Sequence, residues 1–281
     1  VIKELDNKNL IYKKDGAIWF KGTELGRDVD RVIVKSTGEP TYRLPDIAYH
    51  RDKYKRKYDL MVDVFGADHM DAYPDVLSAV NALGFEDNKV RVLIHQFVTI
   101  LKDGNPIKMS TRKANFISLD NLIDEVSADV TRFFFIMRNM NSHLNFDINI
   151  AKEESDINPV FYIQYAHARC CSILKKYEND LEKISVDILD QLTTEQETKI
   201  IAKLLQFPDI VKKCITTLEP QNISNYLSEL ASMLHSYYAK QRVVNPDNPS
   251  LSDARIYLIN SIRIVIKNGL SLLKISAPEK M

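Results

Sequence analysis

The sequence predicts an α/β region followed by an all-helical domain, with a boundary near residue 155. Short apolar runs broken by Gly and Pro fill residues 1 to about 118, as is typical of strands and turns. Within them, the order strand, helix, strand predicts a parallel crossover, the unit of a doubly wound sheet. Beyond residue 118 the apolar residues recur with the 3.6-residue period of a helix. We therefore expect one domain at residues 1–155 and another at residues 156–281.

Two hairpins are predicted near the start of the chain. Asp15-Gly16 interrupts the stretch LIYKKDGAIWF, and an Asp-Gly pair readily supplies the positive φ angles of a tight turn. The segment RVIVKSTGEPTYRL predicts a second hairpin, which turns near Gly38.

The crossover is predicted from three consecutive segments. DLMVDVFGADH is a strand-like apolar run that ends at Gly66-Ala67-Asp68-His69. In YPDVLSAVNALGF the apolar residues have helical spacing, and Gly84 follows them as a C-terminal cap. KVRVLIHQFVTIL then resumes an extended structure.

Helices are predicted from residue 118 to the C-terminus. Asn158-Pro159 indicates an N-cap followed by proline in the first helical position. The later segments VFYIQYAHARCCSILKKY, TEQETKIIAKLLQF, NYLSELASMLHSYYAKQRVV and ARIYLINSIRIVIKNGLSLLKI all have helical spacing. One helical face is expected to contain Leu119, Leu122, Ile123, Val126, Val130, Phe133, Phe134 and Met137, and a second, near the C-terminus, Ile259, Ile262, Ile266, Leu270 and Leu273.

Composition is typical of a soluble protein of the reducing cytoplasm, and we expect no membrane contact. The 281 residues suffice for about two domains of ordinary size. Lys+Arg and Asp+Glu both total 38, so any nucleic-acid contact must come from a local patch. The three cysteines lack metal-ligand spacing, and no apolar run approaches the ~18 residues that span a membrane.

Polar residues after the predicted strands form a candidate nucleotide site. Ligands of doubly wound sheets bind at the carboxyl ends of the strands, where Asp68 and His69 are expected. Further on, a loop contains KMSTR, in which Lys108 can meet the charge on a leaving pyrophosphate and Ser110 can donate a hydrogen bond. From the residues alone, a solvated basic loop and a structural role for His69 remain open alternatives.

A series of short motifs resembles the arginyl-tRNA synthetases, a family of class I aminoacyl-tRNA synthetases. Each motif is weak alone, but their order is specific: GAIWF, PTYRLPDIAYHRDK, VFGADH, KMSTR, NFISLDNLIDEV, FDINIA, NPVFYIQYAHAR and APEKM. The resemblance covers essentially the whole chain. It implies that residues 1–155 are the C-terminal portion of a Rossmann-like catalytic domain, and that residues 156–281 form a helical-bundle anticodon-binding domain.

The resemblance identifies KMSTR as the class I signature loop, which stabilises the departing pyrophosphate when the amino acid attacks ATP. It implies catalytic roles for Lys108, Ser110 and Arg112, and ATP contacts for His69, Lys108 and Met109. The loop departs from the family pattern at Thr111, where a second lysine is common. Whether Arg112 shares the work of that lysine stays open.

The resemblance further implies that Tyr42, Asp46 and Asp68 bind the substrate L-arginine. A guanidinium group has five donors in one plane, so it requires carboxylate and hydroxyl acceptors. Tyr42 and Asp46 are four residues apart, so they could share one side of the chain if it becomes helical after Pro45. Without the resemblance, we would interpret Asp46 as an acid that stabilises a helix N-terminus.

An anticodon-binding surface is expected on the helical domain. Tyr162, Tyr165 and Arg169 lie three and four residues apart, so they share one helix face. The resemblance implies that these residues, with Tyr238 and Met281, contact the anticodon loop. Tyrosines at this spacing are also common in helical cores, which remains an alternative. Arg169 and the nearby His167 favour the anticodon interpretation, because a core seldom holds both.

The His-x-Gly-His signature of class I synthetases does not occur in the chain, and the family's N-terminal tRNA-contacting domain has no counterpart in it. We therefore expect a C-terminal fragment, inactive alone, of an enzyme that joins arginine to arginine tRNA with ATP. Mg2+ is expected to accompany ATP, without a protein-bound metal site, and we expect a monomer. The alternatives are a non-catalytic tRNA-binding module and a generic nucleotide-binding α/β protein with a helical oligomerisation domain.

Overall fold

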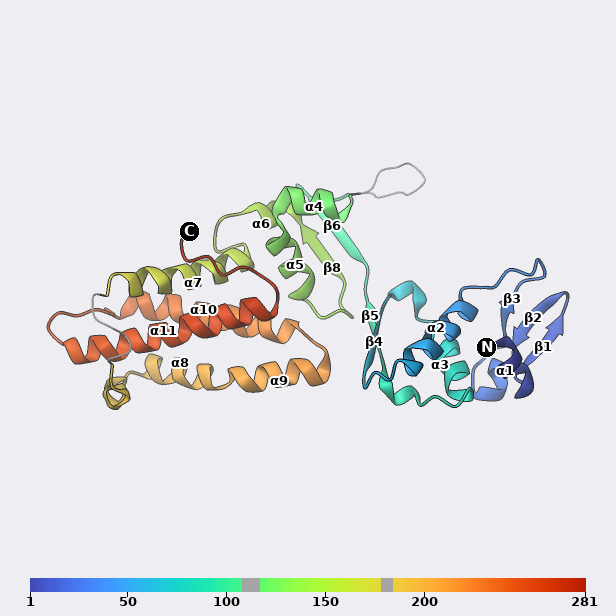
Figure 1. Ribbon diagram of the computed structural model, residues 1–281. Coiled ribbons are helices and arrows are strands. Elements are labelled where there is room, and N and C mark those ends of the chain that lie inside the picture. The colour runs from blue at the N-terminus through green and yellow to red at the C-terminus, as the bar shows by residue number, and fades with distance from the viewer. Residues whose placement is uncertain (108–116, 178–183) are drawn as a thin grey trace. The chain divides into compact units, whose positions relative to one another are not determined.

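The computed structural model describes residues 1–107, 117–177 and 184–281 (Figure 1). Four predicted site residues, Lys108, Met109, Ser110 and Arg112, lie outside these ranges. The chain divides into two compact units, Val1–Phe97 with Met140–Ser142 and Val98–Asn139 with His143–Met281. This division reflects packing, and the domain boundary near residue 155 stays a prediction.

The first unit begins with a helix and a three-stranded antiparallel sheet. Asp15 and Gly16 have φ angles of 53° and 76°, so the turn between the first two strands has the left-handed conformation that Asp-Gly favours. This confirms the first predicted hairpin. The elements are α1 (Ile2–Asn7), β1 (Ile11–Lys14), β2 (Ala17–Phe20) and β3 (Arg31–Val34), in the sheet order β1-β2-β3.

The second predicted hairpin is wrong in its pairing. The chain does turn at Gly38, with a φ of 87°, but beyond the turn the pairing reduces to one bridge between Val34 and Pro40. β3 pairs with β2 instead. The residues after Pro40 enter a helix, because their apolar side chains, such as the buried Ile47, complete the core beneath the sheet.

The predicted crossover is confirmed. Strand β4 (Met61–Gly66), helix α3 (Tyr73–Ala82) and strand β5 (Val90–His95) follow one another, and the two strands are parallel, with Met61 opposite Val90. Gly84, at a φ of 96°, lies just past the end of α3 and donates to the Asn81 carbonyl at 2.8 Å. It therefore ends the helix as predicted.

The two faces of β4 have different surroundings. Met61, Asp63 and Phe65 point towards α3 and towards α2 (Arg43–Lys55), whereas Val62 and Val64 on the other face are 42% and 60% exposed. Because side chains alternate along a strand, this register places the carboxylate of Asp63 beneath α2.

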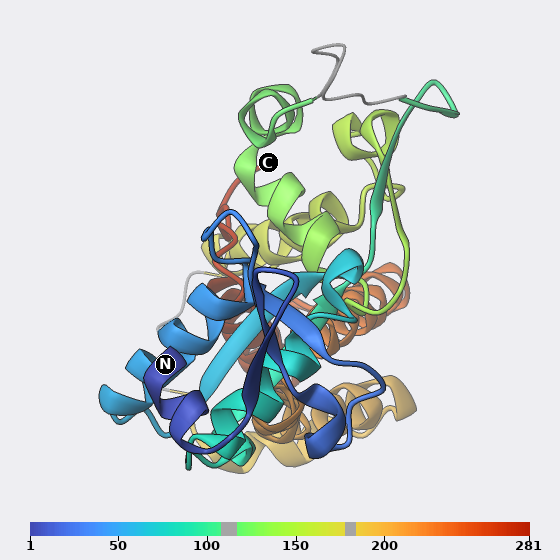
Figure 2. The ribbon, with the colours of Figure 1, turned by 90° about the vertical axis from the view of Figure 1, so that its right-hand side faces the viewer.

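The second unit begins with a small mixed sheet. β6 (Val98–Lys102) lies between β7 (Asn105–Pro106) and β8 (Leu144–Asp147), antiparallel to the former and parallel to the latter. β6 and β8 run side by side in both ribbon views (Figure 2). Helices α4 (Leu119–Val126), α5 (Ala128–Ile136) and α6 (Ile148–Lys152) accompany this sheet around a core that includes Ile100, Leu122, Phe134, Phe146 and Ile148.

The predicted helical face over residues 119–137 belongs to two helices. Ser127, with φ 81° and ψ 159°, breaks the helix, and its hydroxyl accepts a hydrogen bond from the Val130 amide at 3.4 Å to cap α5. Leu122, Val126, Phe133 and Phe134 are buried as predicted, but Leu119 is 59% exposed. The apolar period continues across the break because α4 and α5 contribute to the same core.

Five longer helices form most of the second unit. The predicted start of α7 is confirmed, since Asn158 accepts from the amides of Val160 and Phe161 and Pro159 follows it. No helix in the described part of the chain is long and apolar enough to cross a membrane. The helices are α7 (Pro159–Lys175), α8 (Glu195–Leu205), α9 (Phe207–Thr217), α10 (Gln221–Lys240) and α11 (Pro249–Leu272).

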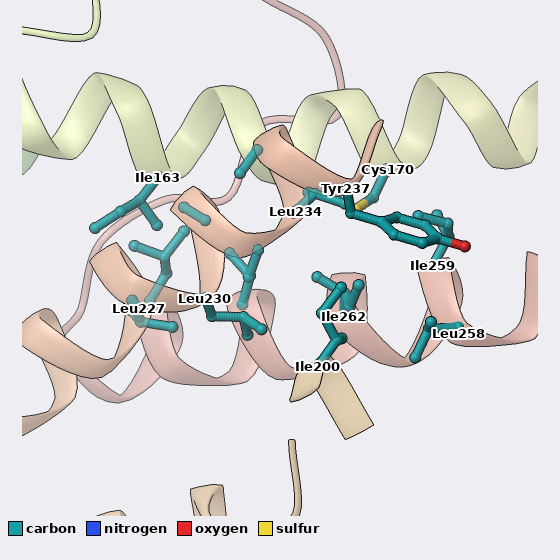
Figure 3. Close-up of a cluster of buried hydrophobic side chains, with 14 of the residues drawn as sticks. Ile163, Cys170, Ile200, Leu227, Leu230, Leu234, Tyr237, Leu258, Ile259 and Ile262 are labelled. Carbon is teal, nitrogen blue, oxygen red and sulfur yellow. The ribbon is translucent and has the colours of Figure 1, made fainter. Parts of the chain in front are cut away.

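These helices share one apolar core (Figure 3). Leu227, Leu230 and Leu234 of α10 meet α7 and α11, and the predicted stripe on α11 is buried, which confirms it. Sequence analysis missed α9. None of its residues is fully buried, although Phe207, Ile210 and Cys214, which have helical spacing, pack against the core.

A buried acid lies inside this helical core. Glu197 of α8 is fully buried, and its Oε1 accepts from Arg255 Nε and from the Tyr237 hydroxyl, both at 2.9 Å. The Thr194 amide donates to its Oε2 at 2.9 Å. Burial raises the pKa of Glu197, but the hydrogen bonds from Thr194, Tyr237 and Arg255 outweigh it, so the pKa lies below its ordinary value.

Replacing Arg255 with methionine should lower the free energy of unfolding by about 3–5 kcal/mol, because the change leaves a buried carboxylate without its cation. Urea unfolding followed by circular dichroism at pH 7 measures this. The folded pKa of Glu197 lies below the unfolded one, so its stabilisation is present above the ordinary value of 4.5 and is lost as the pH falls further. The difference between the two proteins should therefore shrink in acid.

The control is Lys199→Ala, which removes an exposed ion pair with Glu195 on the same helix. It should change stability by less than about 0.5 kcal/mol. A loss for Arg255→Met that is no larger than the control's would contradict the assigned role of the buried pair.

Candidate functional site

A small pocket lies at the carboxyl end of β4, where the sequence predicts a ligand site. Its interior volume of about 10 Å³ is about what one water molecule needs, so a larger ligand would lie across its mouth. Two of the predicted residues, Asp46 and His69, line it. The full lining is Asp46, His50, Asp63, Phe65, His69, Ala72, Tyr73, Val76, Leu77 and Val92.

Asp46 lies in the first turn of α2, one turn beyond Tyr42. The amide of Asp46 donates to the Tyr42 carbonyl at 3.3 Å, so both residues lie on one side of the helix, as predicted. The helix begins at Arg43, so Pro45 lies in its first turn. Tyr42 is 55% exposed and lies outside the lining of the pocket.

The start of α2 at Arg43 has a physical reason in Asp75 of α3. Its side chain is 4% exposed and receives Nε of Arg43 at 3.0 Å and of Arg27 at 3.3 Å. Nε of Arg31 lies 3.4 Å from it. This buried carboxylate therefore anchors Arg43, the first residue of α2, on α3, and the anchor places Asp46 one turn further along.

Asp68 and His69 form the short turn η2 (Ala67–His69) directly after β4. The ring of His69 stacks on Phe65 with its centroid 5.7 Å away, and its Nε2 lies 3.9 Å from Asp68 Oδ2. The side chain of Asp68 is 65% exposed and lies outside the lining of the pocket. A Cβ on Gly66 would come within 2.5 Å of Asp68 Oδ1, so glycine leaves room for this carboxylate.

Sequence analysis missed a charged cluster in the wall of this pocket. His50 and Lys53 of α2 are 4% and 8% exposed, and both contact Asp63 of β4. Burial raises the pKa of Asp63, but the hydrogen bonds and charges of His50 and Lys53 hold it below its ordinary range. The sequence did contain one signal for this cluster, because the spacing of Asp46, His50 and Lys53 puts all three near one helix face.

A second candidate site lies on α7 and α10. The guanidinium of Arg169 lies between two tyrosine rings, 4.7 Å from the centre of Tyr165 and 5.2 Å from that of Tyr238. These tyrosines are 38% and 44% exposed. Arg169 Nη1 donates to His235 Nδ1 at 2.8 Å, and Nη2 donates to the Tyr165 hydroxyl at 3.1 Å. The structure thus brings together predicted residues from two helices in a partly exposed aromatic and cationic cluster.

The side chains of Tyr162 and His167 are more buried than we expect for residues that contact an anticodon loop. Tyr162 packs against the helical core and against the ring of His235. His167 is fully buried, and its Nδ1 donates to the Pro278 carbonyl at 2.9 Å. The expectation that Arg169 and His167 together mark a binding surface was therefore wrong for His167, which fastens the C-terminal segment to α7.

Met281 lies near the first turns of α7. It is 47% exposed and lines a hollow with Phe161 and Gln164. The contact of His167 with Pro278, and that of the Gln164 amide with the Ser276 carbonyl at 3.0 Å, hold the segment before it. Met281 and Tyr165 thus belong to the same region of the second unit.

Two family models match the chain. The model described as "tRNA synthetases class I (R), catalytic domain" matches residues 1–173, and the "DALR anticodon binding domain" matches residues 163–281. Both descriptions agree with the predicted order of an α/β catalytic region and a helical anticodon-binding region.

Curated relatives named arginine–tRNA ligase match over the whole chain. The protein from Desulfotalea psychrophila is 48% identical over 284 residues, which are 100% of this chain and 51% of the relative. The protein from Chlorobium limicola is 50% identical over 285 residues, covering 100% of this chain and 52% of the relative. The chain therefore spans about half the length of the curated relatives it matches.

Solved structures agree with this match. A Campylobacter jejuni structure described as an arginyl-tRNA synthetase has a TM-score of 0.90 and 32% identity, and covers 100% of this chain and 61% of that one. The Thermus thermophilus arginyl-tRNA synthetase, at 20% identity and a TM-score of 0.79 over 100% of this chain and 57% of that one, shares the fold. From the matches of both family models and the identity to these relatives, we conclude that the chain belongs to the arginyl-tRNA synthetase family.

Proposed function

We propose that the protein containing this chain is an arginine–tRNA ligase. It activates arginine with ATP and then transfers the arginyl group to arginine tRNA. The observation that supports this most directly is the meeting of Asp46 and His69 at one pocket, at the carboxyl end of a parallel strand pair. Ligands of doubly wound sheets bind at that edge.

For the amino acid, we propose that the guanidinium lies across the mouth of this pocket. Asp46 supplies the carboxylate that neutralises it, and a charge-assisted hydrogen bond suits this pairing. Tyr42, just before α2, and Asp68, in η2, are both exposed, so their oxygens can accept from its remaining donors. The alternative for Asp46, an acid that stabilises the start of α2, is compatible with its place in the first turn.

For ATP, we propose His69 with Lys108 and Met109, while Lys108, Ser110 and Arg112 stabilise the departing pyrophosphate. A lysine placed where negative charge develops lowers the barrier, because it is already oriented when the charge appears. Mg2+ would arrive on the phosphates of ATP and neutralise part of their charge. We propose that it is held by these phosphates, without a protein-bound metal site.

For tRNA, we propose that Tyr165 and Tyr238 offer their exposed rings to unstacked anticodon bases, with Arg169 between them. Tyr162 supports this cluster from the core side, and Met281 contacts the same loop. Aromatic rings bind single-stranded bases by stacking, and the cation between them suits a neighbouring phosphate.

We propose a monomer, and a location in the cytoplasm, with which the free cysteines Cys170, Cys171 and Cys214 are compatible. A non-catalytic tRNA-binding module is not favoured, because the relatives that match the whole chain are named as ligases.

Asp46→Asn should raise the KM for arginine by about ten- to a hundredfold, because losing a charge-assisted hydrogen bond amounts to about 1.5–3 kcal/mol. The measurement is arginine-dependent ATP–pyrophosphate exchange in the full-length protein. Asp52→Asn, an exposed acid on the same helix, is the control and should leave KM unchanged. If Asp46→Asn lowers only the melting temperature, Asp46 stabilises the helix and does not bind substrate.

Lys108→Ala should slow the same exchange reaction by about 10²–10³, because one preorganised charge stabiliser is lost from the transition state. Arginine affinity should hardly change, since the loop acts on the phosphates. Lys102→Ala, which removes an exposed lysine upstream of the loop, is the control. An exchange rate equal to that of the control would reject the phosphate role of KMSTR.

Tyr238→Ala should weaken binding of an arginine-tRNA anticodon stem-loop by about 1–3 kcal/mol, because one stacking ring is lost. Fluorescence titration at two salt concentrations measures it, and affinity should fall as salt rises. The matched control is the neighbouring Tyr237→Phe, which keeps a buried ring but removes a donor to Glu197. It should reduce stability and leave affinity unchanged. The opposite pattern would show that the helical unit reads the anticodon elsewhere.

A further inference from the structure

We infer that His50 is the positioning residue of the arginine site: it holds the Asp46 turn of α2 in register with β4. This inference rests on the proposed function, since it assumes that Asp46 binds the substrate guanidinium. His50 lies one turn beyond Asp46 and lines the same pocket.

The ring of His50 joins two elements. Its Nδ1 lies 2.9 Å from the main-chain carbonyl oxygen of Asp46, and its Nε2 lies 2.6 Å from Asp63 Oδ2 on β4. The carbonyl oxygen and the ionised carboxylate both accept, so each contact is a hydrogen bond when the ring nitrogen that faces it carries a proton. His50 thus connects the turn that carries Asp46 directly to the strand.

Lys53 occupies the other oxygen of the same carboxylate. Its Nζ donates to Asp63 Oδ1, and its ammonium lies 5.2 Å from the centre of the Tyr49 ring. Asp63 therefore contacts two residues of α2 that are three positions apart. Lys53 holds the last turn of the helix, whereas His50 contacts the carbonyl of Asp46 in the first turn.

The cluster of His50, Lys53 and Asp63 is better explained by the register that it gives α2 on β4 than by a gain in the stability of the fold. Buried ionic groups seldom stabilise a protein more than apolar side chains of similar size would, whereas they do select one arrangement over its neighbours. The chain continues from Asp63 through Phe65 of β4 to Asp68 and His69 of η2, so the register of α2 on β4 sets the position of Asp46 relative to these residues. A shift of about 1 Å at such a site can change rates a hundredfold.

Two replacements of His50 separate the two contacts. Asparagine puts its amide nitrogen near the place of Nδ1, so it keeps the contact with the Asp46 carbonyl and loses Asp63. Glutamine puts its amide nitrogen near the place of Nε2 and keeps the contact with Asp63. In the full-length protein, His50→Asn should raise the KM for arginine by about ten- to a hundredfold and leave the KM for ATP unchanged. His50→Gln loses the contact with the Asp46 carbonyl, so it should raise the arginine KM as well, because the positioning role requires both contacts.

Further variants distinguish positioning from mere support of the fold. Lys53→Met removes the second partner of Asp63 and should lower the melting temperature with little change in arginine KM. If it raises this KM as much as His50→Asn does, docking of α2 in general sets the site, and the inference is wrong. If His50→Asn does not fold, Asp63→Asn, which keeps the shape of the side chain, should show the same selective rise in arginine KM, and an unchanged KM overturns the inference.

The comparison with Asp46→Asn separates this inference from the proposed function. If Asp46→Asn raises the arginine KM and both His50 variants leave it unchanged, the positioning role is overturned and the arginine site stands. If Asp46→Asn also leaves it unchanged, the assignment of the arginine site itself is wrong.

Discussion

The carboxylate of Asp63 on β4, a side chain that is only 12% exposed, is the constraint on which the pocket of the first unit depends. A carboxylate removed from water is destabilising unless donors meet it, and here His50 and Lys53 engage both of its oxygens. Both donors come from one helix, so satisfying the charge also fixes that helix on the strand. The candidate ligand site then forms where the strand ends and the helix begins.

Two other carboxylates in the described residues also join separate elements of the structure. The carboxylate of Asp75 forms ion pairs with Arg27, Arg31 and Arg43. Inside the helical unit, the carboxylate of Glu197 accepts hydrogen bonds from Arg255 and Tyr237. In each case an acid on one helix meets donors from other segments. An apolar contact would tolerate sliding, whereas a hydrogen-bonded charge has a narrow range of distances and angles. These acids therefore specify how elements meet, next to both candidate sites.

Elements whose signals are local were predictable from the sequence. The Asp15-Gly16 turn, the Asn158-Pro159 start of α7 and the end of α3 at Gly84 follow from backbone preferences of single residues. The stripe on α11 follows from the helical period. The break at Ser127 was not predictable, because the apolar period runs through it. The ion pair that anchors the first residue of α2 was not predictable either, because it depends on Asp75, a residue of another helix.

For the candidate sites, the sequence by itself determined the family, through the order of short motifs. It also determined which side chains are available: a carboxylate and a tyrosine four residues apart, an Asp-His pair after a strand, and tyrosines at helical spacing. Only the tertiary structure decided which of these side chains meet. It placed Asp46 and His69 on one pocket, put Arg169 between Tyr165 and the distant Tyr238, and assigned His167 to the core. It also introduced His50, whose role depends on Asp63, thirteen residues away on a strand. The physical reason is that periodicity reports which face of an element is apolar, whereas the partner of a buried charge is set by how the elements pack.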